Sequence, residues 1–364
     1  MGTLSAVFRF IQQRLFPVIE ETAPEPLTDK QREFVRVAEL LDLEKHMRPY
    51  RGTGMGRPPH DRLSIALAFL AKAVWNLPTT AVLVQFLQDS PNVRRLCGWE
   101  GRAEVPSEST FSRAFAAFAG GELGTRVHET LIRAHRQPKL VGHCSHDATA
   151  IEARERPVKK AKTAAAPRRR GRPRRGDVRE PKPPRRVEVQ GGRRLAENLA
   201  ELPRQCDVGC KRNTKGHPSW WVGYKLHLTV TDGDIPISAI LTSASLHDSQ
   251  VAIPLMQMSA QRVTSLYDLM DSAYDAAEIK AFSRSLQHVP LIDPLPRPGQ
   301  PLCPLDPAQA RRYQERTAAE RVNSEVKDNY GGRFVRVRGA AKVMTHLMFG
   351  VLAIAAKHLF ALLE

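Results

Sequence analysis

Residues 220–245, WWVGYKLHLTVTDGDIPISAILTSAS, decide the fold. Two apolar runs rich in β-branched residues, 220–231 and 235–245, flank the sequence Asp-Gly-Asp at 232–234. Aspartate and glycine accept the backbone conformations of a tight turn, so this stretch predicts a β-hairpin. We therefore expect an antiparallel pair of strands near the middle of the chain.

The pattern on both sides of the hairpin predicts more strands, alternating with helices. Upstream, KLVGHCSHDATAIEA (139–153) has strand character from Val141 to Ile151. Downstream we expect a helix at 249–260, a strand at 263–270, a helix at 274–286, a strand at 289–292, a long helix at 307–327 and an apolar helix at the end. This order predicts an α/β fold, a mixed sheet flanked by helices. It is also the order of a ribonuclease H-like core, which is a likeness of fold and leaves function to the site.

The region before the sheet has helical spacing throughout. Apolar residues recur at helical intervals over 29–47, 61–75 and 106–118, and Thr79 and Thr80 can cap a further helix that ends near residue 88. Residues 1–135 thus predict an all-helical domain that binds DNA or dimerises. Residues 136–364 would form the sheet domain.

Positive charge is concentrated in one segment. The chain carries a formal net charge of +17 and has a pI near 10.0, which indicates a polyanionic partner such as nucleic acid. Residues 154–194 hold 17 Lys and Arg against four Asp and Glu, a net charge of +13. The segment is rich in Pro and Gly and poor in large apolar residues. We predict a basic, disordered insertion in the sheet domain, at about 154–215.

The densest part of this insertion is RRRGRPRR at 168–175. An extended arginine-rich segment can lie in a narrow A·T minor groove, where the negative potential attracts arginine. The alternative is a basic linker without specificity. The candidate DNA contacts are Arg168, Arg169, Arg170, Arg172, Arg174 and Arg175.

Cysteine use and hydropathy bear on the compartment. The five cysteines are odd in number and scattered, which favours a reducing, intracellular setting over a disulfide framework. Arg9 and Arg14 interrupt the apolar residues among the first 21, and this pattern predicts an amphipathic helix. The apolar C-terminal helix contains charged and titratable residues, among them Lys342 and Lys357. We expect it to dock on the core, and we expect no membrane span.

One helix carries a stripe suited to DNA chemistry. Tyr313, Arg316, Glu320 and Lys327 have offsets of 0, 3, 7 and 14, which fall within roughly 60° of one another on a continuous helix. A carboxylate can bind a metal ion, and Arg and Lys can hold phosphates beside it. A solvated helix face with incidental ion pairs is the alternative.

Two further carboxylates lie near strand ends. Asp147 is near the end of the strand at 141–151, and Asp271 comes directly after the strand at 263–270. Two such aspartates with Glu320 from a crossing helix can hold two divalent ions about 3.5–4 Å apart, one to activate a nucleophile and one to stabilise the leaving oxygen. Oxygen ligands suit Mg²⁺ or Mn²⁺.

Two other aspartates compete with Asp271. Asp268 lies three residues earlier, so its side chain would point to the opposite face of the strand. Asp248 follows His247 at the start of a predicted helix, where capping is the expected role. We favour Asp271 and keep Asp248 as its rival.

These residues together resemble the bacterial insertion-sequence transposases of the DDE type. The most specific match is Tyr-x2-Arg-x3-Glu-x6-Lys at 313–327. Weaker matches are Asp-Ala-Thr at 147–149, Gly-Tyr-Lys-Leu-His at 223–227, Leu-His-Asp at 246–248 and Asp-x-x-Tyr-Asp at 271–275, where Ala273 replaces the usual Gly. The chain also departs from the family in its long insertion and in the short gap before Glu320.

The resemblance implies a ribonuclease H-like enzyme that cleaves the ends of a mobile element and transfers them to target DNA. Asp147, Asp271 and Glu320 would be the metal ligands, and Tyr313, Arg316 and Lys327 would contact end DNA. It further implies a homodimer on double-stranded DNA and a bacterial, cytoplasmic, nucleoid-associated protein. The alternatives are a metal-dependent nuclease without strand transfer and a non-catalytic architectural DNA-binding protein.

Overall fold

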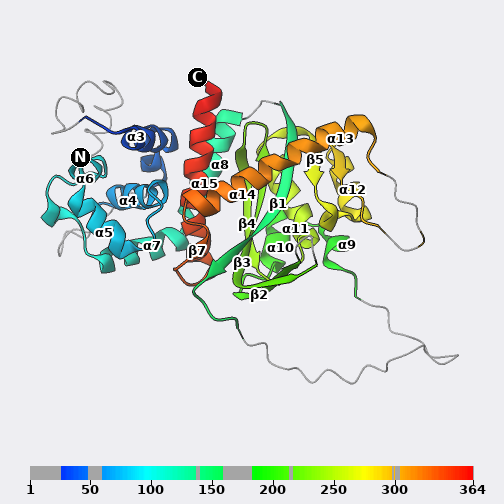
Figure 1. The fold of residues 1–364 in the computed structure, drawn as a ribbon, viewed down its shortest axis with the longest axis horizontal. Helices are drawn as coiled ribbons and strands as arrows, with labels where there is room; N and C mark the ends of the chain where they lie inside the picture. The colour runs from blue at the N-terminus through cyan, green and yellow to red at the C-terminus, as the bar shows by residue number, and fades with distance from the viewer. Residues whose placement is uncertain are drawn as a thin grey trace.

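One mixed sheet forms the centre of the protein (Figure 1). The structure, a computed structural model, describes residues 26–47, 60–136, 140–158, 183–212, 216–296, 299 and 304–363. Within these residues seven strands join the sheet: β1 (Leu140–Ala153), β2 (Asp207–Arg212), β3 (Pro218–Thr231), β4 (Ile235–Ser243), β5 (Thr264–Met270), β6 (Val289–Ile292) and β7 (Phe334–Val335).

The strand order confirms the predicted fold class. β3 and β4 form the expected hairpin, whose turn uses positive φ angles at Gly233 (81°) and Asp234 (58°). β1 lies antiparallel to β3 on one side and parallel to β5 on the other, and β6 extends the parallel part. The sheet is therefore mixed, as a ribonuclease H-like core requires, with β1 in the middle.

The N-terminal region is all-helical across its described residues, as predicted. Its elements are α3 (Asp29–Leu41), η1 (Leu43–His46), α4 (Arg62–Val74), α5 (Thr80–Asp89), α6 (Pro91–Leu96), η2 (Arg102–Glu104), α7 (Glu108–Gly120) and α8 (Leu123–Arg136). Side chains of Thr28, Asp61 and Thr79 cap α3, α4 and α5. The helix predicted for the first 21 residues lies outside the described residues.

The other helices cover the sheet. They are α11 (Ser249–Ala260), η3 (Ser272–Tyr274), α12 (Ala277–Ser285), α13 (Pro307–Tyr313), η4 (Gln314–Arg316), α14 (Thr317–Asn329) and α15 (Ala340–Leu363). α11 packs on β3 and β4, whereas α14 crosses β1 and β3 (Figure 1). The path of α14 decides which side chains can reach Asp147.

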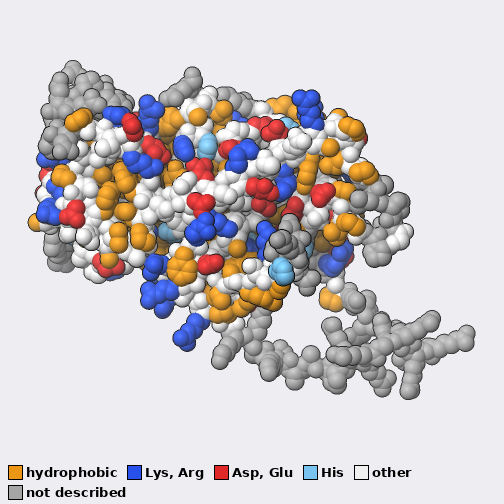
Figure 2. All heavy atoms as spheres, in the orientation of Figure 1, with side chains coloured by type: hydrophobic (Ala, Val, Ile, Leu, Met, Phe, Trp, Pro, Cys, Tyr) orange, Lys and Arg blue, Asp and Glu red, His pale blue; other side chains and the backbone are white. Residues whose placement is uncertain are grey.

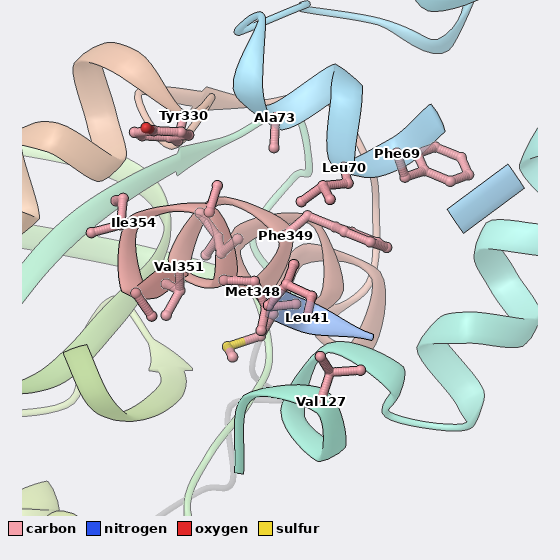
Figure 3. Close-up of a cluster of buried hydrophobic side chains, with 14 of the residues drawn as sticks. Leu41, Phe69, Leu70, Ala73, Val127, Tyr330, Met348, Phe349, Val351 and Ile354 are labelled. Atoms are coloured by element: carbon pink, nitrogen blue, oxygen red, sulfur yellow. The ribbon is translucent and has the colours of Figure 1, made fainter. Parts of the chain in front are cut away.

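α15 is packed from both sides, between the N-terminal helices and the sheet (Figure 1). Figure 3 shows Phe349 of α15 beside Leu70 and near Phe69 of α4, whereas Val127 of α8 lies on the side of α15 that carries Met348. The same helix packs against β4. By length and composition Ala340–Leu362 could cross a membrane, but 72% of its most apolar window is buried inside the protein. The helical region and the sheet therefore share one hydrophobic core.

The prediction of disorder over 154–215 is wrong for residues 183–212. These residues form α9 (Arg186–Gln190), α10 (Leu195–Glu201) and β2. Val187 and Leu202 are buried in clusters that include residues of α11, and Asn198 Nδ2 donates to Gln257 Oε1 at 2.9 Å. A few well-spaced apolar residues are enough to anchor these short helices, and the average composition of the segment conceals them.

Candidate active site

Two aspartates lie side by side where β5 ends. Asp147 is in β1, and Asp271 directly follows β5. The two strands run parallel, and their register pairs Ser145 with Leu269. Two residues further along each strand, where side chains return to the same face, are Asp147 and Asp271. The sheet therefore brings these two carboxylates together.

Burial raises the pKa of both carboxyl groups. The pKa of Asp147 rises to about 6, mainly because the group is removed from water, and the negative charge of Asp271 adds to the rise. Burial likewise raises the pKa of Asp271. Asn323 Nδ2 donates to Asp147 Oδ2 at 2.9 Å, and the amide of Ala273 donates to Asp271 Oδ1 at 3.0 Å. Two desolvated carboxylates form a site that a bound cation would stabilise.

Glu320, the third predicted ligand, stands apart from this pair. It lies in the first turn of α14, its side chain is 51% exposed, and Arg316 Nη2 donates to its Oε1 at 2.6 Å. The positive charge of Arg316 also acts on Asp147 and Asp271. Among the described residues, no three His, Cys, Asp or Glu side chains gather closely enough to hold a metal ion. The structure thus unites two of the three predicted ligands, and Arg316 interacts with all three.

The helix that carries the predicted stripe is interrupted, which corrects the expectation of one continuous helix over 307–327. α13 ends at Tyr313, and the 3₁₀ turn η4 separates it from α14. The three residues of a 3₁₀ turn rotate by about 360°, against about 300° in an α-helix, so Tyr313, Arg316, Glu320 and Lys327 still share one side of the helical segment. The carbonyl of Glu315 in this turn accepts a hydrogen bond from Ser145 Oγ of β1 at 3.1 Å. The Arg316 guanidinium lies 5.7 Å from the centre of the Tyr313 ring.

Lys327, the last stripe residue, belongs to a group of cations beside the aspartates. Burial lowers the pKa of Lys327, and the nearby positive charges of Lys211 and Arg333 lower it further. Lys211, in β2, also acts on Asp271. Cations that destabilise one another in this way are typical of a surface that receives an anionic partner.

Asp268 points away from the site, as the alternation along β5 predicts. It is 1% exposed, it accepts a hydrogen bond from Ser283 Oγ at 2.6 Å, and it lies 3.1 Å from His146 Nε2. Burial alone would raise the pKa of Asp268, but hydrogen bonds from His146 and His288 outweigh burial and hold the pKa well below its usual range. Asp268 therefore belongs to a buried structural network.

Asp248 is held by an ion pair, so the prediction that its side chain caps α11 is wrong. Asp248 occupies the N-cap position but makes no capping hydrogen bond, and Lys225 Nζ donates to its Oδ1 at 2.8 Å. Lys225 is three residues from Leu228, the β3 partner of Asp147, so its side chain leaves the opposite face of the sheet. The ion pair occupies the Asp248 carboxylate, although its charge still reaches Asp271 and raises the pKa of that group.

Two buried polar groups beside the aspartates are not evident from sequence spacing alone. Asn323 is 5% exposed, and its Oδ1 has no hydrogen-bond partner among the described residues. The buried hydroxyl of Tyr274 also has none there, and the charges of Asp248, Asp147 and Asp271 act on it. An unpaired buried polar group costs about 1–3 kcal/mol, so these two oxygen atoms beside the aspartates are candidates to meet a bound ion or water. Asn323 follows Glu320 by three residues, so the two lie on one side of α14, but this spacing does not show that Asn323 meets Asp147.

The predicted DNA contacts of the insertion, residues 168–175, lie outside the described residues. The described part of the chain shows where the insertion leaves the sheet. The amide of Arg154, just after β1, donates to the carbonyl of Val335 in β7 at 3.1 Å. The basic insertion therefore starts next to β7.

Asp147→Asn should stabilise the metal-free protein at neutral pH. The folded-state pKa of Asp147 is about 6 against an ordinary value of 3.8, so ionisation costs stability that accumulates between about pH 4 and 6 and persists above. We expect a gain of about 1–2 kcal/mol at pH 7.5 and little gain at pH 4. Thermal unfolding with EDTA measures this. The exposed acid Glu44 provides the control Glu44→Gln, and equal effects of both substitutions would refute the prediction.

Two family models match the sequence. Residues 142–355, more than half of the 364-residue chain, match the model described as Transposase DDE domain. Residues 23–117 match a second model, described as Transposase domain (DUF772). Comparisons with curated proteins and with solved structures gave no match. The first match spans Asp147, Asp271 and Glu320, and the second spans most of the N-terminal helices.

Proposed function

The chain belongs to the transposase DDE domain family, and from this premise we propose that it cleaves the ends of a mobile DNA element and joins their 3′-hydroxyl groups to target DNA. The metal ligands in this proposal are Asp147, Asp271 and Glu320, and the cofactor is Mg²⁺ or Mn²⁺. The observation that carries the proposal is the half-buried pair Asp147 and Asp271, two carboxylates in adjacent register whose pKa values are both raised.

The residues at the pair fit a hard divalent cation. The donors nearest Asp147 and Asp271 are oxygen and amide groups, which Mg²⁺ and Mn²⁺ prefer over the sulfur and imidazole ligands typical of zinc. The unpaired Asn323 Oδ1 and Tyr274 hydroxyl offer further oxygen atoms, as ligands or as partners of bound water. When bound, divalent ions would activate the attacking water or 3′-hydroxyl and stabilise the leaving oxygen.

In this proposal Glu320 completes the site by leaving its ion pair with Arg316 and joining Asp147 and Asp271 at the metal ions. Its carboxylate is ion-paired with Arg316 and half-exposed, so it can turn without disturbing the core. A DNA phosphate offers the Arg316 guanidinium a bidentate partner. Binding of DNA would thus draw Arg316 away and free Glu320 to approach Asp147.

The other residues of the site would hold the carboxylates, the Arg316 guanidinium and the bound DNA in position. The hydrogen bond from Asn323 Nδ2 to Asp147 Oδ2 would hold this carboxylate in position. The Tyr313 ring lies within cation–π distance of the Arg316 guanidinium and would help to hold it in place. Lys327 and Lys211 stand where the backbone of a bound strand would need positive charge. A positioned set of this kind lowers the reorganisation needed for phosphoryl transfer.

The test is incubation of the purified full chain with labelled element ends, target DNA and Mg²⁺. We expect both cleaved ends and joined products. Cleavage without joined products would favour a nuclease, and binding without either product would favour an architectural protein. The proposal includes a homodimer on paired ends, for which the mass of the protein–DNA complex in solution is the measurement.

Replacing residues 159–182 with a Gly/Ser segment of equal length should weaken DNA binding and flatten its salt dependence. The segment holds 11 Lys and Arg against two Asp and Glu, a net charge of +9. If a third to a half of these cations meet phosphates, the slope of log K against log salt concentration should fall by about 3 to 5. Fluorescence anisotropy of a labelled duplex provides the measurement.

A shuffled segment of the same composition is the matched control. It keeps the charge, so it should restore the slope. It should lose any preference for A·T-rich duplexes if the order of residues 168–175 matters. A slope that is unchanged in the Gly/Ser variant would show that the insertion does not meet DNA.

A further inference from the structure

A cationic cavity lies where the N-terminal helices meet the start of α15. It has a volume of about 240 Å³ and opens to solvent. This is below the roughly 300–1,000 Å³ of pockets for drug-sized ligands, so a small group fits it better. In Figure 2, Lys and Arg side chains gather over β7 and the loop into α15. Among the described residues no acidic side chain lines the cavity, and its polar lining residues are Lys72, Thr80, Ser112, Arg336, Arg338, Lys342 and His346.

Among these residues, Lys72 gives the strongest indication that the cavity binds an anion. It is 7% exposed, at the end of α4, and burial lowers its pKa to about 8, so it is still mostly protonated at pH 7. Within the described part of the chain it has no acidic partner. A buried ammonium without a counterion is costly. Burial and the charge of Lys72 lower the pKa of His346 to about 3, so this imidazole is neutral.

Two helices add to the positive potential. Thr80 is the first residue of α5, and α15 begins just after Arg338, so the amino ends of both helices lie at the cavity. Helix amino ends carry partial positive charge, and Lys342 in the first turn of α15 adds a full positive charge beside it. Glu155 is also bound at the start of α15, but it accepts hydrogen bonds from Gly339 N–H at 2.6 Å and the Tyr224 hydroxyl at 2.7 Å and does not line the cavity.

We infer that this cavity binds a phosphate group of the DNA backbone and so holds a duplex at the junction of the N-terminal helices and the sheet. The inference rests on the proposed function, since it takes DNA as the partner. Lys72 supplies the buried charge. Arg336, Arg338 and Lys342 are exposed at the rim and can close over the phosphate. The hydroxyls of Thr80 and Ser112 add neutral donors.

The position of the cavity supports a DNA phosphate as the ligand. β7, which leads into the cavity, pairs with Glu152 and Ala153 of β1. Ala153 is six residues beyond Asp147, about 20 Å along the strand. That length corresponds to about 6 base pairs of a duplex. A duplex bound at the aspartates could pass the cations near Lys327 and reach the cavity, beside the point where the basic insertion begins.

The test measures DNA binding in EDTA, where no cleavage occurs, so its outcome is separate from that of the proposed function. The proteins are the full-length chain and its variants Lys72→Met and Arg338→Ala. Anisotropy of a labelled duplex is recorded over a range of salt concentrations. Each variant should weaken binding about tenfold and lower the salt slope by about 1. Arg284→Ala, which removes an exposed arginine of α12, is the matched control and should change neither.

Unchanged affinity and slope in both variants would overturn the inference, even if the wild-type protein cleaves and joins DNA. Lys72→Met retains the apolar stem, and its melting temperature shows whether it folds. A second experiment distinguishes a phosphate group of DNA from free inorganic phosphate as the ligand of the cavity. Inorganic phosphate, compared with chloride at equal ionic strength, should compete with DNA for the wild-type protein more than for Lys72→Met. If it instead stabilises only the wild-type protein while DNA binding is equal in both, the cavity takes free phosphate and the DNA assignment is wrong.

Discussion

Asp271→Asn is expected to lower the rate of end cleavage at least about 1,000-fold and to leave the affinity for the same DNA within about twofold. The substitution keeps the shape of the side chain and the acceptor for the Ala273 amide, but it removes the charge that would hold the cation. Metal ions contribute several kcal/mol to the stabilisation of such transition states. Each 1.36 kcal/mol is a factor of ten, so a loss of about 4 kcal/mol gives the expected effect.

The same assay separates Asp271 from its rival. Asp147→Asn and Glu320→Gln should match Asp271→Asn, whereas Glu315→Gln, an exposed acid in the adjoining turn, should keep activity. Asp248→Asn should lose far less activity, because that carboxylate is occupied by Lys225. An active Asp271→Asn together with an inactive Asp248→Asn would move the second ligand to Asp248. If the Glu320→Gln variant kept its activity, the proposal that Arg316 moves from Glu320 to a DNA phosphate would be wrong.

Phe349→Ala is expected to destabilise the whole protein by about 3–5 kcal/mol. Phe349 is 2% exposed, and its ring centre lies 6.0 Å from that of Phe69 in α4. Its helix is in contact with the N-terminal helices and with β4, so the cavity left behind affects both regions. A loss of this size is a large part of the 5–15 kcal/mol that stabilises a typical domain.

Urea unfolding followed by circular dichroism measures this effect. Limited proteolysis at increasing urea concentration then shows which region opens first. Leu362→Ala, on the same helix but 52% exposed, should change stability by no more than about 0.5 kcal/mol. We expect one transition in which the helices and the sheet unfold together. Two transitions, with residues 60–136 opening alone, would contradict a shared core.

The sequence predicted the sheet and its hairpin well because strand alternation and turn chemistry are local. The bounds of β3, β4 and β5 agree with expectation to within about two residues. Local patterns also placed Asp147 and Asp271 at adjoining strands. What they could not show is the partner of each carboxylate, because the Lys225–Asp248 pair and the Arg316–Glu320 pair depend on how side chains meet in space.

The other differences between the predicted and the observed structure also arise from contacts between residues that are far apart in the sequence. The 3₁₀ turn before α14 lies at a contact between Ser145 of β1 and the carbonyl of Glu315, 170 residues later, which no local pattern records. α9 and α10 exist because α11 offers them an apolar surface. Asn323 became visible as a partner of Asp147 only once α14 was placed across β1.

The central position of α15 has a consequence for synthesis of the chain. The N-terminal helices end at Arg136, and the helix that completes their core begins roughly 200 residues later, at Ala340. At about 5–20 residues per second, a ribosome needs some 10–40 s to make that interval. During this time the apolar faces of α4, α7 and α8 lack the side chains that will cover them. The nascent chain is therefore expected to engage chaperones until its last 25 or so residues emerge, and a polypeptide released early is a substrate for proteolysis rather than a partial DNA-binding protein.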